Sequence, residues 1–333
     1  RSLYVLDDIT PLRQLAEVAR GSAAHLFTPR DSYRAQVGGG GAGGVENAPD
    51  PLPMGALLQA WFAAAPDSAS HVDVLDARGL VVRSFTTDTA RARRLGQPPL
   101  RALAGAQRIV WDLTYPGPNL LEGQTIWGYT GGVKAPPGNY QVRLATAQTT
   151  QSRTFRVLAD PRIPQVTQAD YDEQFRVSAA VRDSMNAANE AIALIRAVRE
   201  QAMRAVEQAA RINRASDVKP MADALSGKLG GVEGALIQTR SESDQDPIRF
   251  PGQIDNELTE LYTNLTGTDS YIYGGPEGRP TRGAMERMND VLRVWTPLSA
   301  RLRAILETDV PAFNELLRRL GLGAIVLPAK PVT

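Results

Sequence analysis

The sequence predicts a mixed α+β protein of several domains, in which an immunoglobulin-like β-sandwich is followed by an antiparallel helical bundle. The chain has 333 residues, more than the roughly 250–300 that a single hydrophobic core usually serves. Residues 55–160 alternate apolar and polar side chains in short runs separated by turn residues. From residue 161 to 323, apolar side chains recur every three or four positions, which is the period of an α-helix.

The composition is that of an ordinary folded protein, and it excludes several functional classes. Lys and Arg number 37 against 36 Asp and Glu, so the net charge gives no reason to expect nucleic acid as a partner. No apolar run reaches the roughly 18–20 residues that cross a bilayer. The chain has no cysteine, which excludes a disulfide framework, thiolate catalysis and cysteine-ligated zinc. We expect no cofactor and no metal.

Residues 1–15 are predicted to be one strand followed by a short helix. Leu3 to Leu6 supply the apolar run of the strand, and Thr10 and Pro11 suit the N-cap and the first helical position. A single strand is not stable alone, so we expect its partner strands elsewhere. The first residue is Arg1 rather than Met, and we expect it to begin either a processed product or the ordered part of a longer chain.

Residues 16–54 are interpreted as a linker. The run from Gly38 to Gly44 is almost entirely glycine, and prolines at positions 49, 51 and 53 follow it. Such a composition favours a flexible spacer that ends in a stiffer one. A phosphate-binding loop is the sharper alternative, but the Gly-Lys-Ser/Thr ending that such a loop needs is absent.

Six strands are expected between residues 55 and 160, at a spacing near ten residues that is typical of an immunoglobulin-like sandwich. Asp76 to Gly79 is a hairpin turn signal, and the turn from Pro136 to Gly138 introduces a later strand. In the fourth strand, Ile109 and Trp111 occupy alternate positions, so one face should be buried. The expected strands are Ala56–Phe62, His71–Leu75, Leu80–Phe85, Gln107–Leu113, Asn139–Thr146 and Gln151–Leu158.

Residues 161–323 carry four apolar stripes, each of which predicts a helix, and residues 324–333 are expected to be a tail. Thr167 to Asp170 resembles a capping box with Asp in place of Glu. The first stripe runs from Tyr171 to about Ile212, on the order of 60 Å of helix. We expect Pro297 to bend the last helix. Further stripes begin at Met221, Ile254 and Met285.

Three stretches, in this order, resemble bacterial sortilin-like, BNR-repeat β-propeller proteins. Arg1 to Leu12 resembles the end of the last propeller blade. The motif Val110 to Pro118, followed by Ala135 to Tyr140, resembles the sandwich domain that comes next. Residues 160–175, which include Asp160-Pro-Arg162, resemble the junction with the helical region. The similarity covers nearly the whole chain, except for the Gly-rich insert at 38–44.

The resemblance implies a secreted or otherwise extracytoplasmic protein whose propeller precedes these residues. Such proteins are often labelled glycosyl hydrolases because sialidases also contain BNR propellers, but a shared fold does not fix a function. No Asp-box occurs in this sequence. Any activity housed in a propeller is therefore not carried by these residues.

Aromatic residues in two loops are the candidate binding residues. Residues 114–134 form a long loop rich in Gly, Pro and aromatics, and loops of this length are often functional. Two interpretations remain open: these rings stack on a sugar or clasp a partner protein, or Trp111 is core and the loop packs on a neighbouring domain. The candidates are Trp111, Tyr115, Trp127, Tyr129, Tyr271 and Tyr273.

Other polar residues give weaker signals. His25 and His71 have no metal-ligand spacing to a second histidine. The adjacent acids Asp7 and Asp8 point to opposite sides of a strand, and capping the following turn is their simpler role. The acids around Asp246 lack the Gly and the closing Glu of a calcium loop. No catalytic residue stands out.

We therefore expect a non-catalytic structural or interaction module that mediates domain packing or protein–protein association. Its expected partners are its own N-terminal propeller, other protein subunits or glycans; we expect no nucleic acid and no membrane-spanning segment. Two alternatives belong to other classes: part of a sialidase-like glycoside hydrolase, and a carbohydrate-binding accessory module.

Overall fold

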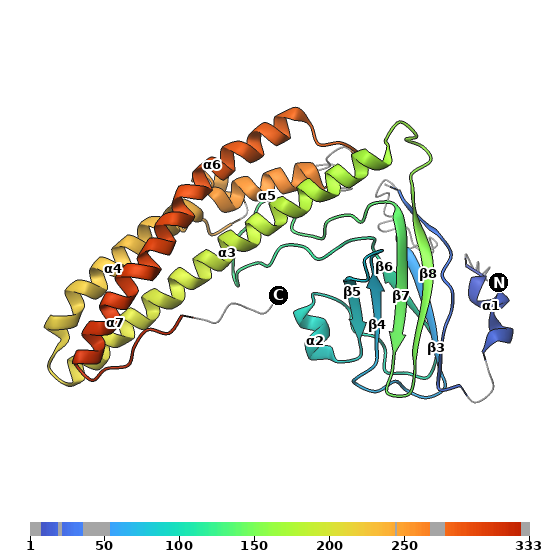
Figure 1. Ribbon diagram of the computed structural model, residues 1–333, viewed down its shortest axis with the longest axis horizontal. Coiled ribbons are helices and arrows are strands. Elements are labelled where there is room, and N and C mark those ends of the chain that lie inside the picture. The colour runs from blue at the N-terminus through green and yellow to red at the C-terminus, as the bar shows by residue number, and fades with distance from the viewer. Residues whose placement is uncertain (1–7, 19–21, 36–53, 244, 267–276, 328–333) are drawn as a thin grey trace. The chain divides into compact units, whose positions relative to one another are not determined.

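The computed structural model describes residues 8–18, 22–35, 54–243, 245–266 and 277–327, and its ribbon is drawn in Figure 1. The chain forms two compact units. Unit 1 comprises residues 1–117, 131–176 and 269–279, and unit 2 comprises residues 118–130, 177–268 and 280–333. Unit 1 contains two β-sheets and unit 2 is helical, so the predicted mixed α+β class is confirmed.

Two sheets build unit 1. The smaller has the order β1-β3-β6 and the larger the order β2-β8-β7-β4-β5. Neighbouring strands are antiparallel except for β2, which runs parallel to β8. The strands are β1 (Ala24–Leu26), β2 (Ser32–Arg34), β3 (Ala56–Phe62), β4 (His71–Leu75), β5 (Val81–Thr86), β6 (Gly105–Trp111), β7 (Gly138–Ala145) and β8 (Thr150–Ala159). All six strands predicted between residues 55 and 160 are present, with ends within two residues of those expected.

One hydrophobic core joins the two sheets. Leu58 and Trp111 contribute to it from the smaller sheet, and Val142, Leu144 and Phe155 from the larger. Inward and outward side chains alternate along β6 and β7, as the two-residue period of a strand requires. The face predicted for Ile109 and Trp111 is buried.

Residues 16–54 were expected to be a linker, but part of this range is β-structure. His25 lies at the middle of β1, and Tyr33 at the middle of β2. Both strands are only three residues long and have no run of apolar residues, so tertiary pairing rather than local propensity makes them strands. The run Gly38 to Gly44 and the strand expected at Leu3 to Leu6 lie outside the described residues.

The short helix after the first strand is present as α1 (Thr10–Arg13), with Pro11 in its first turn. Its N-cap is Ile9 rather than Thr10. Asp8 Oδ1 accepts a hydrogen bond from the Thr10 amide at 2.9 Å, which is the turn-capping role expected for this acid.

Helix α3 (Gln168–Arg211) begins in unit 1 and continues into unit 2. The predicted capping box is confirmed: Thr167 N–H donates to Asp170 Oδ2 at 2.9 Å, and the Asp170 amide donates to Thr167 Oγ1 at 3.3 Å. The stripe that includes Val181, Ile192 and Ile195 is buried. The helix has 44 residues, close to the length that the stripe predicted.

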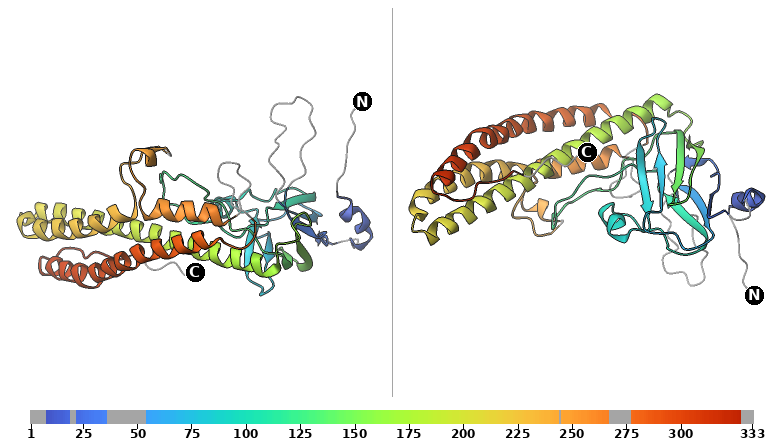
Figure 2. Two further views of the ribbon diagram at one scale, coloured as in Figure 1. Left: turned by 90° about the horizontal axis from the view of Figure 1, so that it is seen from above. Right: turned by 60° about the horizontal axis from the view of Figure 1, so that its bottom comes forward.

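The remaining helices of unit 2 are α4 (Ala215–Leu236), α5 (Ile254–Leu265), α6 (Arg282–Ala304) and α7 (Val310–Arg319), shown from two further sides in Figure 2. Helix α4 packs against α6 and α7, and α5 packs against α6. Pro297 lies inside α6, which continues through it. A π-helical turn at Ile305–Asp309 separates α6 from α7.

The two units are discontinuous in sequence, unlike the linear domains 55–160 and 161–323 that the sequence suggested. Residues 118–130, which connect β6 to β7, belong to unit 2, and residues 269–279, which connect α5 to α6, belong to unit 1. The chain thus passes from one unit to the other at five places.

Candidate functional site

The two described candidate residues of unit 1 are held in packed surroundings. Trp111 is fully buried, and its Nε1–H donates to the Thr114 carbonyl at 2.9 Å. Its ring contacts Tyr140 at 5.1 Å between centroids. Tyr115 packs on Phe175 at 4.6 Å. The Trp111 ring is therefore part of the core and offers no surface on which a sugar could stack.

The other described candidates lie in unit 2. The ring of Tyr129 stacks on Tyr262 at 5.8 Å, and the Tyr129 amide donates to Thr263 Oγ1 at 2.8 Å. Trp127 lines a small polar cavity together with Asp255. Tyr271 and Tyr273 lie outside the described residues. The described aromatic candidates are therefore divided between the two units, with Trp111 and Tyr115 in unit 1 and Trp127 and Tyr129 in unit 2.

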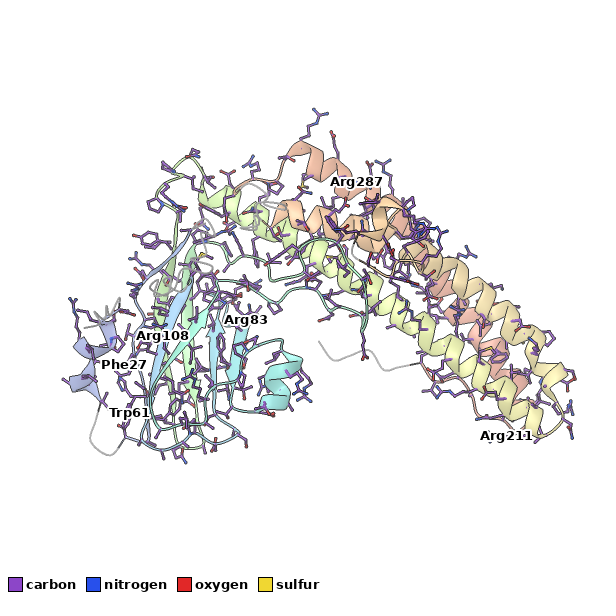
Figure 3. All side chains as sticks on the ribbon, turned by 180° about the vertical axis from the view of Figure 1, so that it is seen from behind. Phe27, Trp61, Arg83, Arg108, Arg211 and Arg287 are labelled. Carbon is purple, nitrogen blue, oxygen red and sulfur yellow. The ribbon has the colours of Figure 1, made fainter. Side chains whose placement is uncertain are left out.

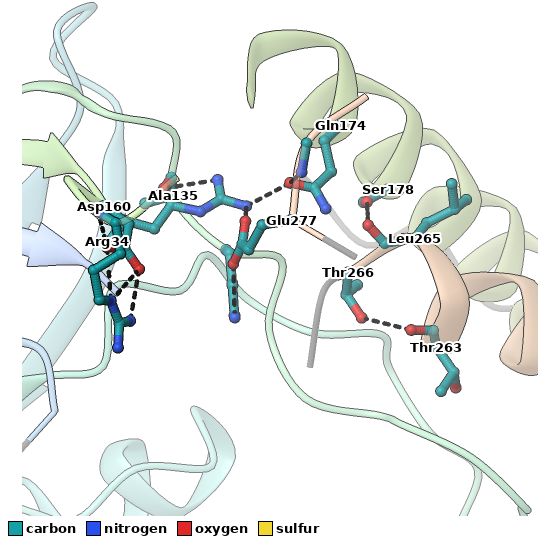
Figure 4. Close-up of polar contacts among 12 residues, drawn as sticks. Arg34, Ala135, Asp160, Gln174, Ser178, Thr263, Leu265, Thr266 and Glu277 are labelled. Atoms are coloured by element: carbon teal, nitrogen blue, oxygen red, sulfur yellow. Dashed lines mark hydrogen bonds and ion pairs between the residues drawn. The ribbon is translucent and has the colours of Figure 1, made fainter. Parts of the chain in front are cut away.

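A buried charge cluster in unit 1 has a structural role. Figure 4 shows the Arg34 guanidinium at the end of β2 with its partners. Its Nη2 lies 2.6 Å from Glu277 Oε2 and also donates to Gln174 Oε1 at 2.6 Å. Lys134 Nζ lies 2.9 Å from the other Glu277 oxygen, so the buried carboxylate is neutralised by two cations. Arg34 also donates to the Ala135 carbonyl.

No cluster of three or more metal-ligating residues occurs in the part of the chain that the structure describes. His25 is buried edge-on against Phe27, and burial lowers the pKa of its ring. His71 lies 3.6 Å from Asp73. The Asp246 carboxylate accepts hydrogen bonds from the amides of Glu242 and Ser243, which makes it a turn-capping group.

A groove follows the outer edge of β6; we call it the edge groove. Its volume is about 610 Å³. Its apolar lining comes from β5, β6 and the segment between them, and Leu103 is 61% exposed there. The apolar lining residues are Phe85, Pro98, Pro99, Leu100, Leu103, Ala104, Ala106, Ile109 and Val110. Its polar residues are Arg101, Gln107 and Arg108, of which Arg108 is labelled in Figure 3.

The register of the smaller sheet determines which backbone groups of β6 face the edge groove. The Phe27 amide donates to the Gln59 carbonyl, so Gln59 directs its backbone groups toward β1. Its partner on β6 is Arg108. In an antiparallel pair, a residue opposite a non-bonded partner directs its own N–H and C=O away from that strand. The N–H and C=O groups of Ala106, Arg108 and Val110 therefore point out of the sheet edge.

Positive charge surrounds this edge. Residues 89–108 contain five arginines and no acid. Two of them, Arg101 and Arg108, line the edge groove, and the other three lie exposed on α2 (Thr89–Arg94). No ion pair joins any of the five to an acid within the described residues. The edge groove combines an apolar floor, unpaired backbone groups and uncompensated cations.

Sequence reasoning missed this surface. The run of arginines without an acid between residues 89 and 108 was visible, but the strand that it flanks looks like any other half-buried strand. The strand order shows it as an edge, because β6 pairs only with β3 among the described strands.

No family model matches the chain, and neither a curated protein nor a solved structure is significantly similar to it. None of the helices in the described ranges is long and apolar enough to cross a bilayer.

Proposed function

We propose that this chain is a non-catalytic interaction module that captures an extended, acidic segment of a partner protein at the edge groove. The unpaired N–H and C=O groups of Ala106, Arg108 and Val110 carry the proposal. A sheet edge of this kind is a template for an added strand, whose main-chain hydrogen bonds supply affinity. The apolar floor and the arginines would then select which segment is added.

The chemistry of the partner follows from the charge around the edge groove. A second copy of the same edge would bring five more arginines against these five, and like charges placed together across an interface cost several kcal/mol. An acidic segment would instead be attracted and steered by them. Alternate apolar side chains of such a segment would face Pro98, Leu103 and Val110. This argument favours a partner segment with alternating acidic and apolar residues.

We further propose that unit 1 is an immunoglobulin-like sandwich. Strand orders β1-β3-β6 and β2-β8-β7-β4-β5 correspond to A-B-E and A′-G-F-C-C′ in a variable-type domain, and the described residues hold no strand D beside β6. The Tyr140 hydroxyl at the start of β7 donates to the Pro136 carbonyl at 2.9 Å, as in a tyrosine corner. A missing strand D accounts for the open edge. For unit 2, the packing of α4, α5, α6 and α7 supports an antiparallel bundle.

The resemblance to sortilin-like BNR-repeat proteins supports a wider proposal: a secreted protein in which these units accompany a propeller. The ordered motifs at residues 1–12, 110–118, 135–140 and 160–175 support it. The sequence encoded upstream of Arg1 tests this proposal, because repeated Asp-boxes are expected there. A continuous upstream reading frame without such repeats would contradict it.

The edge groove is tested with a labelled ten-residue peptide of alternating glutamate and valine, and with a lysine–valine peptide of equal length. We expect the acidic peptide to bind at least tenfold more tightly by fluorescence anisotropy, with an affinity that falls as salt is raised. Hydrogen exchange at Ala106, Arg108 and Val110 should slow when the peptide is bound. Equal binding of both peptides would refute the proposal.

Two variants separate strand addition from charge attraction. Arg108→Pro removes an outward N–H and leaves the hydrogen bonds to β3 intact, because proline is tolerated where the N–H faces away from the sheet. Arg108→Ala removes the same charge and keeps the N–H. We expect at least tenfold weaker binding for Arg108→Pro and only two- to threefold for Arg108→Ala. Equal losses would show that binding is electrostatic and not strand addition.

A further inference from the structure

Asp255 of unit 2 is a buried acid with an unsatisfied oxygen. It lies in the first turn of α5 and is 9% exposed. Its Oδ1 is buried and has no hydrogen-bond partner. Its Oδ2 is 3.4 Å from the Gln124 amide nitrogen, a long and weak contact. Buried polar groups are almost always satisfied in native proteins, so such an exception needs an explanation.

The surroundings of Asp255 are rigidly built. Gln124 also donates to Asn189 Oδ1 of α3 at 3.3 Å, and Asn189 donates to the Asn119 carbonyl at 2.7 Å. Gly128, with φ +131°, packs so closely on α5 that a Cβ would lie 2.9 Å from Thr259 and Thr263 atoms. Residues 118–130 are therefore held firmly against the helices of unit 2.

A cavity of about 20 Å³ is lined in part by Asp255. About one water molecule, or one group of similar size, fits such a volume. The other described residues of its lining are neutral: Thr125, Trp127, Gln238, Ser241, Ser243, Gly252 and Asn256. Asp255 is therefore the only charge among the described residues that line the cavity.

The size, charge and donor set of the cavity select one kind of occupant. A calcium ion takes six to eight oxygen ligands and commonly more than one carboxylate, whereas one carboxylate balances one positive charge. Hydroxyl and amide oxygens together with an acid accept the N–H donors of an ammonium group. An indole beside such a group adds attraction when its ring faces the cation.

We propose that the cavity at Asp255 binds one primary ammonium group, the terminal group of a small amine ligand or of a lysine side chain. The Asp255 carboxylate accepts one of its N–H bonds, and hydroxyl and amide oxygens of the lining accept the others. The proposal does not depend on the edge groove, which belongs to unit 1.

The test is a titration of the whole chain with methylammonium chloride, followed by the indole N–H signal of Trp127 in nitrogen-15 NMR. Trp127→Phe identifies that signal among the four tryptophans of the chain. We expect a saturable shift at pH 8. Tetramethylammonium, which is too large and has no N–H, should give none at the same ionic strength. Potassium and calcium ions are titrated in parallel.

Asp255→Asn should abolish the saturable shift, whereas Glu200→Gln should leave it unchanged, because Glu200 is an exposed acid of α3. Both variants remove one negative charge from unit 2. The proposal is overturned if methylammonium gives no saturable shift, which would mean that the cavity holds water only. It is also overturned if calcium or tetramethylammonium competes equally, or if Asp255→Asn binds as the parent chain does.

Discussion

Glu233 and Asp255 are both buried acids of unit 2, and their surroundings are opposite. Glu233 Oε1 is 2.7 Å from Arg196, and its Oε2 is 2.6 Å from Arg199. Asp255 has a long contact with the neutral Gln124 amide, and no cation pairs with it among the described residues. The Glu233 carboxylate on α4 pairs with two guanidiniums of α3 and so links the two helices. A buried carboxylate without a cation instead destabilises the folded state, and a bound cation would remove that cost. The comparison teaches that the partners of a buried acid, and not its burial, indicate its role.

The largest effect is expected at the buried pair of Arg34 and Glu277. Arg34→Met should destabilise unit 1 by about 3–5 kcal/mol, since it leaves a buried carboxylate with Lys134 as its only cation. Hydrogen exchange of β7 and β8 amides measures this loss. Arg176→Met is the control, because that arginine is exposed and lies 4.0 Å from the partly exposed Glu173; it should change stability by less than about 1 kcal/mol. Equal losses of stability in the two variants would contradict a structural role for the pair of Arg34 and Glu277.

Asp255→Asn should have the opposite sign and stabilise unit 2. Burial raises the pKa of this carboxyl to about 6 from an ordinary 3.8. The folded state therefore binds the proton more tightly, and this acid costs stability as the pH rises from about 4 to 6. At pH 8 the cost is about 3 kcal/mol, and the asparagine removes roughly 2 to 3 of it.

The pH dependence separates this effect from a general change in packing. The gain from Asp255→Asn should shrink as the pH falls through 6 and vanish near pH 4, where both chains carry a neutral side chain. Urea unfolding followed by helical circular dichroism at several pH values measures the difference. A gain that is the same at pH 4 and pH 8 would contradict the charge as its cause.

Glu233→Gln should destabilise unit 2 by about 1–2 kcal/mol, less than the change at Arg34. Its two arginines are nearly half exposed, so water solvates them when the acid is lost. The same denaturation experiment gives the value. If Glu233→Gln stabilised unit 2, the conclusion that paired buried acids stabilise it and unpaired ones do not would be wrong.

The smallest effect concerns a buried polar group without charge. Tyr140→Phe removes the hydrogen bond to the Pro136 carbonyl and should cost unit 1 about 1 kcal/mol. Thermal unfolding followed by tryptophan fluorescence is suitable, because Trp111 packs on this ring. If Tyr140→Phe lost as much stability as Arg34→Met, the size of these losses would not depend on the charge of the buried group.

The sequence was sufficient to predict those elements whose structure depends on residues close together in the chain. The bounds of β3 and β4, the capping box at Thr167 and the long stripe of α3 were all readable, because periodicity and capping are properties of neighbouring residues. Strands β1 and β2 were not readable, since each is three residues long and exists through pairing.

Both proposed sites depend on placement that no local pattern encodes. Arg108 is visible in the sequence, but the edge it occupies follows from the strand order. Asp255 looks like an acid in the first turn of a helix, a favourable and common position. Its isolation depends on Gln124, which is 131 residues away. Trp127 was predicted to lie in a long loop and does so, whereas Asp255, which lines the same cavity, was not singled out.

That separation has a consequence for synthesis. Residues 118–130 leave the ribosome well before α5, against which Gly128 and Tyr129 pack. At roughly 5–20 residues per second, the segment waits on the order of 10 s for its partner helix. During that interval its aromatic side chains lack the contacts with α5 that bury them in the folded chain.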